Sequence, residues 1–252
     1  MKLLFAAISF LTRLPIPQSF VFEARDVGKS TIFFPLVGAI IGAIQVLLLT
    51  FFGDLTGANV LKTTLCAVLL LVVNVFVTGA LHLDGLADMA DGFGGGRDKE
   101  RTLEIMRDSL IGSYGAVALI LLILLKTLAL AVLIQDGTAW KLLIIAPVLG
   151  RWATVSLGRF TPYARKSGGL GQSVTDFVGA KELAGASLIA LVVTFSLIGW
   201  LDALKFWVVT IVVTAFIARI CMKKIGGVTG DTMGANTEIC ETMILLTAVF
   251  VR

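Results

Sequence analysis

Three aspartates with helical spacing, Asp84, Asp88 and Asp91, are the side chains of this sequence best suited to chemistry. Intervals of four and three residues place all three carboxylates on one face of a helix. Carboxylates on one stripe repel each other, so we expect a cation against them. The sequence offers only one histidine and these ligands are hard oxygens, which favours Mg²⁺, with Mn²⁺ as the alternative. A solvated acidic turn at a helix end is the competing interpretation.

Glycines and basic residues follow the aspartates directly. The run DGFGGG at 91–96 predicts a flexible backbone whose N–H groups can approach an anion. Each of the arginines that come next can bind two phosphate oxygens at once through its guanidinium. These candidate substrate-binding residues are Arg97, Arg101 and Arg107. A carboxylate-bound metal beside arginines is typical of phosphoryl-transfer sites. The stretch also fits an amphipathic surface helix with Leu103, Met106 and Leu110 on its apolar face, and both interpretations can hold together.

A second acidic, glycine-rich segment, GGVTGDTMGANTE at 226–238, lies far along the chain. It places Asp231 among small residues, with Thr229 and Asn236 as neutral oxygen donors and candidate substrate-binding side chains. If both acidic segments lie on one membrane face, Asp231 can join the metal site of the three aspartates. A tight turn with helix-capping glycines is the alternative.

The elements that must position these side chains are membrane helices. Hydrophobic residues make up 57% and charged residues 15% of the 252 residues, and the mean hydropathy is +0.96. Soluble domains average roughly 45–50% apolar and about 25% charged residues. The composition therefore predicts an all-α, polytopic membrane helix bundle. No linker or low-complexity tract divides the chain, so we expect a single integral-membrane domain over residues 1–252.

The hydropathy pattern predicts about seven transmembrane helices, each near the length that a hydrocarbon layer of roughly 30 Å requires. The last is the weakest, because Glu238 and Glu241 fall in its first turns. Residues 3–14 are too short and interrupted to cross, so we expect an interfacial or re-entrant helix there. The aspartate stripe would continue the second span. The expected spans are 32–52, 60–81, 115–134, 141–159, 183–200, 204–222 and 236–251.

Basic residues set the expected orientation. With the amino terminus inside, most of the 21 lysines and arginines fall in cytoplasmic segments, as the positive-inside rule requires. Both acidic segments then reach the cytoplasmic face. Contact of these loops with anionic lipids or substrates accounts for the net charge of +4, so no nucleic-acid partner is expected. Arg151 lies inside a span, where it either pairs with a carboxylate or lines a phosphate pocket.

Five motifs, in order and over nearly the whole chain, resemble the cobalamin synthase family of adenosylcobinamide-GDP ribazoletransferases. They are FLTRLPIP at 10–17, FFPLVGAIIG at 33–42, the acidic segment at 82–115, GR at 150–151 and the segment at 226–238. The long acidic motif is the most specific. The resemblance implies a Mg²⁺-dependent enzyme of the cell inner membrane with its active site on the cytoplasmic face. Such an enzyme joins adenosylcobinamide-GDP to α-ribazole, or to its 5′-phosphate, and releases GMP.

The resemblance also implies roles for the candidate residues. Metal held by Asp84, Asp88, Asp91 and Asp231 would bridge the diphosphate and stabilise the leaving charge. Either Asp91 or Asp231 would orient or deprotonate the attacking hydroxyl. Phosphate oxygens would be held by Arg97, Arg101 and Arg107, with Arg13 or Arg151 as further candidates. Helix faces made of small residues can pack closely against a second copy of the chain, so a homo-oligomer remains an alternative.

Two other functions remain as alternatives. A CDP-alcohol phosphotransferase has related chemistry, but DGLADMADG lacks the Ala-Arg pair and the closing spacing of that family's motif. A secondary transporter would use the carboxylates as ion or proton relays. That function predicts acidic residues near the bilayer midplane and paired inverted repeats, whereas we expect the acids of this chain to gather at one surface.

Overall fold

The computed structural model describes residues 1–56, 59–169 and 171–251, and within these ranges the chain forms helices and turns without a β-strand. The helices are α1 (Lys2–Leu11), α2 (Ala24–Ser30), the 3-10 turn η1 (Thr31–Phe33), α3 (Phe34–Thr56), α4 (Val60–Thr78), α5 (Leu81–Gly95), α6 (Lys99–Ile105), α7 (Ser113–Gln135), α8 (Ala139–Phe160), α9 (Gln172–Asp176), α10 (Ala180–Ile225) and α11 (Gly230–Phe250). The all-α prediction is confirmed.

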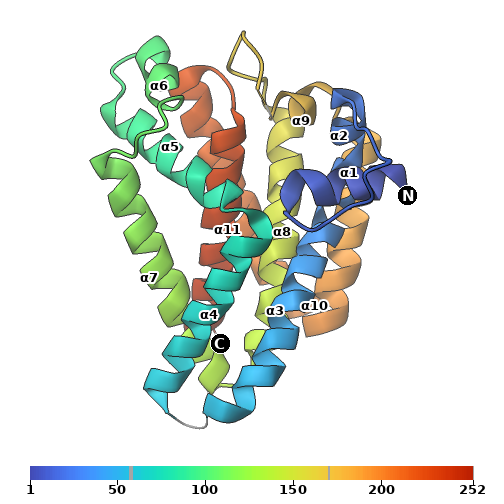
Figure 1. Ribbon diagram of the computed structural model, residues 1–252, viewed down its shortest axis with the longest axis vertical. Helices are drawn as coiled ribbons and strands as arrows, with labels where there is room; N and C mark the ends of the chain where they lie inside the picture. Colours follow the sequence, from blue (N-terminus) through green and yellow to red (C-terminus); the bar gives the residue numbers. More distant parts are fainter. Residues whose placement is uncertain (57–58, 170, 252) are drawn as a thin grey trace.

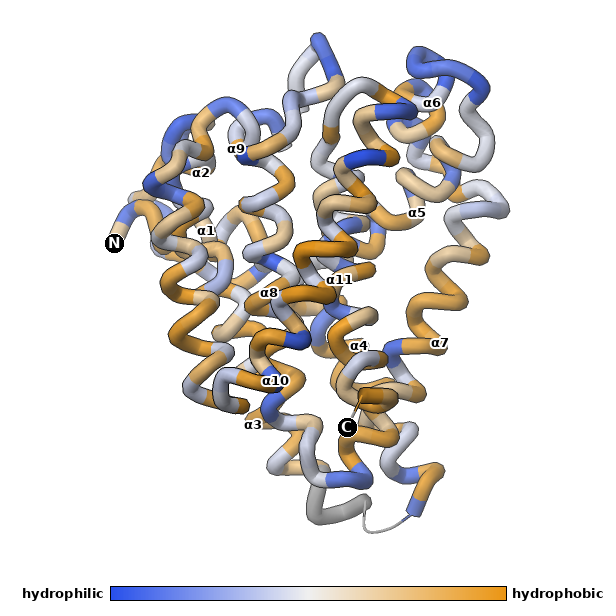
Figure 2. Tube along the Cα trace, turned by 180° about the vertical axis from the view of Figure 1, so that it is seen from behind, coloured by the Kyte–Doolittle hydropathy of each residue, from blue (hydrophilic) through white to orange (hydrophobic). Residues whose placement is uncertain are grey.

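An apolar belt surrounds the bundle between two polar ends (Figure 2). Exposed large apolar side chains cover the outer surfaces of α4, α7 and α10, whereas α8 is buried at the centre against α3, α10 and α11. The helical stretches that are long and apolar enough to cross a membrane are Ala24–Phe52, Val60–Thr78, Ser113–Gln135, Ala139–Phe160 and Ala180–Ile225. Apolar surface that faces outward is stable only in lipid, so the chain is a multi-pass membrane protein.

The long helix α10 is two antiparallel arms. Its chain reverses at Gly199, whose φ of +76° few other residues adopt. The indole N–H of Trp207 donates a hydrogen bond to the Thr194 hydroxyl at 3.1 Å. Thirteen residues of straight helix would hold these groups roughly 20 Å apart. The two arms therefore correspond to the spans predicted at 183–200 and 204–222.

Two predicted helix boundaries are wrong. The aspartates do not continue the second span, because α4 ends at Thr78 and the left-handed residues Gly79 (φ +64°) and Ala80 (φ +59°) start a separate helix, α5. The last helix begins at Gly230 rather than at residue 236. Its acidic residues, predicted in its first turns, therefore lie deeper in the bundle.

The glycine run after the aspartates is also not the flexible loop that the sequence predicts. α5 continues through Gly95, so its N–H groups are used in helical hydrogen bonds. The glycines permit close packing instead: a methyl group on Gly92 would overlap the side chain of Met106 at the end of α6. The run thus fixes α6 against α5 rather than exposing backbone to an anion.

The short helices gather at one end of the bundle, at the top of Figure 1. α2, α5, α6 and α9 lie there, and α1 crosses the bundle nearly at right angles to α8 (Figure 1). Ten residues of helix extend about 15 Å, half of a hydrocarbon layer. α1 therefore does not span the membrane, in agreement with the interfacial or re-entrant helix that was predicted.

Candidate active site

A pocket of about 180 Å³ lies at the end of the bundle that carries the short helices. Asp84 of α5 and Asp231 of α11 both line it, so the two acidic segments meet although they lie far apart in the sequence. Its other polar lining side chains are His82, Thr154, Tyr163 and Arg165, and α1 contributes Phe10 and Leu11. We call this cavity the acidic pocket.

Direct contact between the backbones of α5 and α11 brings the carboxylates together. A methyl group on Gly85 would lie 2.6 Å from the carbonyl oxygen of Asp231 and 2.9 Å from its Cα. Only glycine allows this approach, which places Asp84 and Asp88, on either side of Gly85 in sequence, beside Asp231. Gly85 is therefore the residue that joins the two segments.

The carboxylates of this cluster repel one another. The pKa of Asp88 is raised to about 7, first by burial and then by the carboxylates of Asp231 and Asp84. The pKa of Asp231 is also raised, mainly by burial and further by Asp84, although Arg165 opposes the shift. Burial is the main cause of both shifts, and repulsion among the carboxylates adds to it, so the ionised cluster carries unbalanced negative charge. A bound cation would relieve that imbalance.

The donor set fits Mg²⁺ in chemistry, although it is not assembled as a finished metal site. No three acidic, histidine or cysteine side chains of the described residues stand together as ligands. Instead, the guanidinium of Arg165 lies against Asp231. Carboxylate oxygens are nevertheless the ligands that a hard divalent cation binds. Asp84, Asp88 and Asp231 are the residues that fit this role.

Asp91 is placed differently from the other two aspartates of its stripe. Its carboxylate is buried and accepts the N–H groups of Gly112 at 2.7 Å and Gly115 at 2.9 Å. These donors belong to the start of α7, where unpaired N–H groups need an acceptor. Asp91 therefore caps α7, and of the three aspartates of the stripe only Asp84 lines the acidic pocket.

The arginines after α5 lie at the same polar end but are exposed. The Arg107 guanidinium donates to the Ser167 hydroxyl, and Arg101 forms an ion pair with Glu104 at 2.7 Å. Arg97 follows the end of α5. None of the three lines the acidic pocket. They lie at the polar end of the bundle, outside this pocket.

The amphipathic interpretation of this stretch holds only in part. Leu103 and Met106 pack inward, as expected. Leu110 is 78% exposed, because α6 ends at Ile105 and the chain turns before reaching it. The predicted apolar face is thus one helical turn too long.

The remaining predicted binding residues have structural partners. Thr229 is the N-cap of α11, and its hydroxyl donates to Asp231 Oδ2 at 3.2 Å, which orients that carboxylate. Asn236 is buried and donates to the hydroxyl of Thr214 on α10 at 3.4 Å. Arg13 is exposed, and its side chain lies over Gly79 at the turn between α4 and α5.

Arg165 lines the acidic pocket, although the sequence did not indicate it as a candidate site residue. Its Nη2 lies 2.6 Å from Asp231 Oδ2 and donates to the carbonyl of Met106 at 3.2 Å. It follows Ala164, whose N–H donates to the carbonyl of Val228 in a short parallel bridge between Tyr163 and Val228. No motif marks this loop, and only the bridge shows that it adjoins the second acidic segment.

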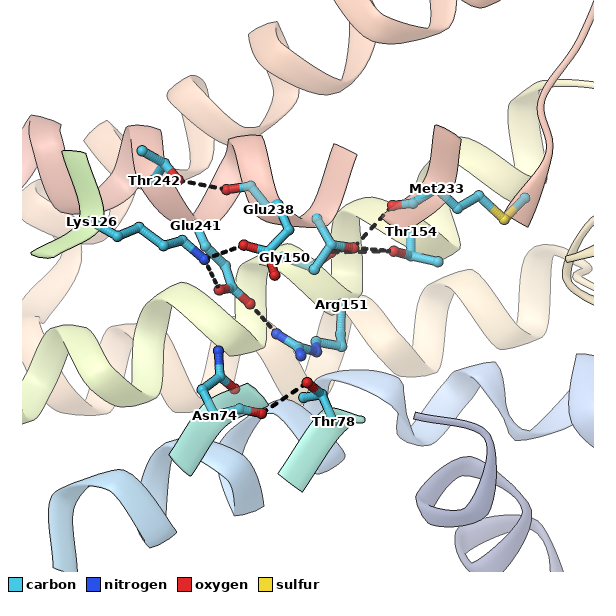
Figure 3. Close-up of polar contacts among 11 residues, drawn as sticks. Asn74, Thr78, Lys126, Gly150, Arg151, Thr154, Met233, Glu238, Glu241 and Thr242 are labelled. Carbon is cyan, nitrogen blue, oxygen red and sulfur yellow. Dashed lines mark hydrogen bonds and ion pairs between the residues drawn. The ribbon is translucent and has the colours of Figure 1, made fainter. Parts of the chain in front are cut away.

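A buried ion cluster lies deeper in the bundle (Figure 3). Lys126 of α7 contacts Glu238 at 2.5 Å and Glu241 at 2.8 Å, both on α11, and Arg151 of α8 pairs with Glu241. All four side chains are at most 5% exposed. Of the two alternatives for Arg151, the structure shows pairing with a carboxylate.

This cluster corrects the expectation that the acidic residues gather at one surface. Glu238 and Glu241 lie inside the bundle because α11 begins earlier than predicted. Their two negative charges are balanced by Lys126 and Arg151. This neutral group of side chains connects three helices, α7, α8 and α11.

The chain is similar to the family described as cobalamin-5-phosphate synthase over residues 3–249. A relative from Pseudomonas fluorescens, named adenosylcobinamide-GDP ribazoletransferase, is 40% identical over 95% of this chain and 96% of its own. Relatives of that name from Pseudomonas syringae (42%; 96% of both chains) and Thermoanaerobacter pseudethanolicus (35%; 99% of this chain and 98% of its own) are also similar. No solved structure matches the chain.

Proposed function

Because the chain belongs to the cobalamin-5-phosphate synthase family and is a membrane-embedded transferase of cobalamin synthesis, we propose that it joins adenosylcobinamide-GDP to α-ribazole or its 5′-phosphate and releases GMP. The observation that carries this proposal is the acidic pocket, in which Asp84 and Asp231 meet beside Arg165 at one polar end of the bundle. Carboxylates and a guanidinium around one cavity suit a diphosphate ester and its metal.

The reaction is a displacement at phosphorus. The ribose hydroxyl of α-ribazole attacks the phosphorus attached to the corrinoid's aminopropanol arm, a new P–O bond forms, and the diphosphate bond to GMP breaks. The hydroxyl proton passes to a carboxylate. A carboxylate that lines the acidic pocket suits this role. Asp91 does not, since both of its oxygens already accept N–H groups.

Asp84, Asp88 and Asp231 would hold Mg²⁺, which when bound neutralises the charge of the diphosphate and of the departing GMP. Asp231 is oriented for this by the Thr229 hydroxyl. Asp91 acts one step away, because it ties α5 to α7 and so fixes the helix that carries the other aspartates.

We further propose that the protein lies in the inner membrane and that its acidic pocket opens toward the cytoplasm. The basic segments around α2, α6 and the loop after α8 lie at the same end as the pocket, as the positive-inside rule predicts for a cytoplasmic face. Arg97, Arg101 and Arg107 would there attract the anionic substrates to the rim.

The direct test measures GMP release by the purified protein in lipid nanodiscs from adenosylcobinamide-GDP and α-ribazole, with and without Mg²⁺. We expect GMP and the ribazole-linked corrinoid to form in equal amounts, and only when Mg²⁺ is present. Asp84→Asn should nearly abolish the reaction, whereas Asp108→Asn, an exposed acid in the turn after α6, should cause a much smaller loss. Wild-type turnover by Asp84→Asn, or consumption of a CDP-activated lipid instead of the corrinoid, would contradict the proposal.

A further inference from the structure

Arg165 separates two hollows at the polar end of the bundle. On one side it lines the acidic pocket, together with Asp84 and Asp231. On the other side it lines an open depression of about 340 Å³, with Arg107 and Lys166. Glu100 and Glu104 also line this depression, so its charge is mixed, and Arg165 is shared between it and the acidic pocket.

The hydrogen bonds of Arg165 are unevenly distributed. Both of its acceptors, Asp231 Oδ2 and the carbonyl of Met106, are contacted by the same nitrogen, Nη2. Among the described residues, neither its buried Nε nor the buried hydroxyl of Tyr163, which also lines the acidic pocket, has a hydrogen-bond partner. Buried donors without acceptors are costly. An oxygen-rich anion in the pocket would supply acceptors to both.

The backbone that carries Arg165 is held firmly on both sides. Ala164 donates to Val228 at 2.8 Å, and Val228 donates to Pro162 at 2.9 Å. Ser167, two residues later, accepts a hydrogen bond from Arg107. With its backbone anchored, the residue can change partners only by moving its long side chain.

Asp231 cannot bind both Arg165 and a metal cation fully through the same oxygen. Its Oδ2 is taken up by Arg165 and the Thr229 hydroxyl, and the nearby carboxylates of Asp84 and Asp88 have no comparable basic partner among the described ion pairs. A divalent cation that binds the three carboxylates through Asp231 Oδ2 would compete with the guanidinium for that oxygen. A displaced guanidinium would lie next to the metal with free donors, where the diphosphate is expected.

We propose that Arg165 is an internal cation that occupies Asp231 in the free protein and transfers to a phosphate of the diphosphate substrate when the divalent cation binds. This inference rests on the proposed function and adds to it the residue that couples metal binding to substrate binding. Because the diphosphate draws Arg165 away from Asp231, each ligand strengthens the binding of the other.

The test measures binding rather than turnover. Mn²⁺ affinity is determined by electron paramagnetic resonance for wild type, Arg165→Gln and Arg159→Gln in nanodiscs without nucleotide. Arg159 is a matched control, since it lies at the end of α8 with its guanidinium over Phe160, away from the pocket. We expect Arg165→Gln to bind Mn²⁺ about tenfold more tightly, the change that one charge-assisted hydrogen bond produces, and Arg159→Gln to match wild type.

GDP affinity at saturating Mn²⁺ provides the second measurement. Arg165→Gln should bind GDP about tenfold more weakly than wild type, because the phosphate loses its guanidinium partner. Arg165→Lys keeps the charge, so it should retain wild-type Mn²⁺ affinity but bind GDP more weakly, and it serves as the second variant if Arg165→Gln does not fold.

Unchanged or weaker Mn²⁺ binding by Arg165→Gln, or unchanged GDP binding by both variants, would overturn the inference. Measuring GMP release by the wild-type protein distinguishes failure of the proposed function from failure of the role proposed for Arg165. If wild type releases GMP with Mg²⁺ while the Arg165 variants bind both ligands as wild type does, the proposed function stands and the role of Arg165 falls. If wild type releases no GMP, the proposed function itself fails.

Discussion

The carboxylate of Asp91 accepts the backbone N–H groups of both Gly112 and Gly115, at 2.7 and 2.9 Å. A side chain on either glycine would overlap that carboxylate. Asp91 therefore joins the helix of the acidic pocket to the start of α7, and its negative charge also complements the positive end of the α7 dipole.

Replacing Asp91 should consequently affect stability rather than metal binding. Asp91→Ala leaves two N–H groups at the start of α7 without their acceptor, one of them buried, and we expect a loss of about 1–3 kcal/mol in the free energy of unfolding in mixed micelles. Mn²⁺ affinity should remain near that of wild type. Asp98→Ala removes the exposed cap of α6 and should cost less, about 1 kcal/mol. A stable Asp91→Ala protein that no longer binds Mn²⁺ would instead make Asp91 a metal ligand.

The buried ion cluster predicts a non-additive effect on stability. Lys126→Met leaves the carboxylates of Glu238 and Glu241 with only Arg151 for balance, and breaking a buried pair in this way costs about 3–5 kcal/mol. Lys126→Met combined with Glu238→Gln restores neutrality. The double variant should therefore unfold at a higher temperature than the single Lys126→Met variant in the same detergent. A double variant with a lower midpoint would show that the charges act independently.

The raised pKa of Asp88 predicts that the metal-free protein becomes less stable as the pH rises. The folded state holds a proton on Asp88 up to about pH 7, whereas the unfolded state releases it near the ordinary value of 3.8. Stability is therefore present at low pH and is lost as the pH rises through the folded pKa. In EDTA, the thermal midpoint of wild type should fall between about pH 4 and about pH 7 and level off above that. It should fall less for Asp88→Asn, which mimics the protonated form. Equal pH dependence of the two proteins would contradict the assignment.

The orientation in the membrane is tested by cysteine labelling. Cys66, Cys221 and Cys240 are buried and form no disulfide, so all three can be replaced to give a cysteine-free background. In that background, Ser109→Cys, in the turn between α6 and α7, should react with a membrane-impermeant maleimide only from the cytoplasmic side. Thr138→Cys, in the turn before α8 at the other end of α7, should react only from the periplasmic side. The reverse pattern would place the acidic pocket outside the cell.

Hydropathy located the membrane helices well, including both arms of α10, because long apolar runs carry a strong signal. It did not reveal the break between α4 and α5. The residues from Val77 to Leu81 are apolar or small, and nothing in their hydropathy shows that Gly79 and Ala80 turn left-handed. Hydropathy also placed the start of α11 too late, since the small polar residues after Gly230 read as a loop.

The site was predictable where residue type alone is informative. Asp84 and Asp231 stand out as carboxylates among glycines, and the shared membrane face predicted that they lie at one end. Asp91 carries the same spacing signal, but its role depends on where α7 starts in space. No local sequence pattern marks Arg165, because its position beside Asp231 depends on the bridge between Tyr163 and Val228. That bridge exists only in the folded chain.

The central claim is that the stripe on α5 and the start of α11 form one metal-dependent site. It is tested most directly by comparing kcat/KM for Mg²⁺-dependent GMP release in wild type, Asp88→Ala, Asp231→Ala and the double variant. Residues that act as one unit are strongly non-additive, so the double variant should be scarcely slower than the slower of the two single variants. Losses that multiply in the double variant, with normal Mg²⁺ dependence in each single variant, would contradict the claim and separate Asp231 from the metal.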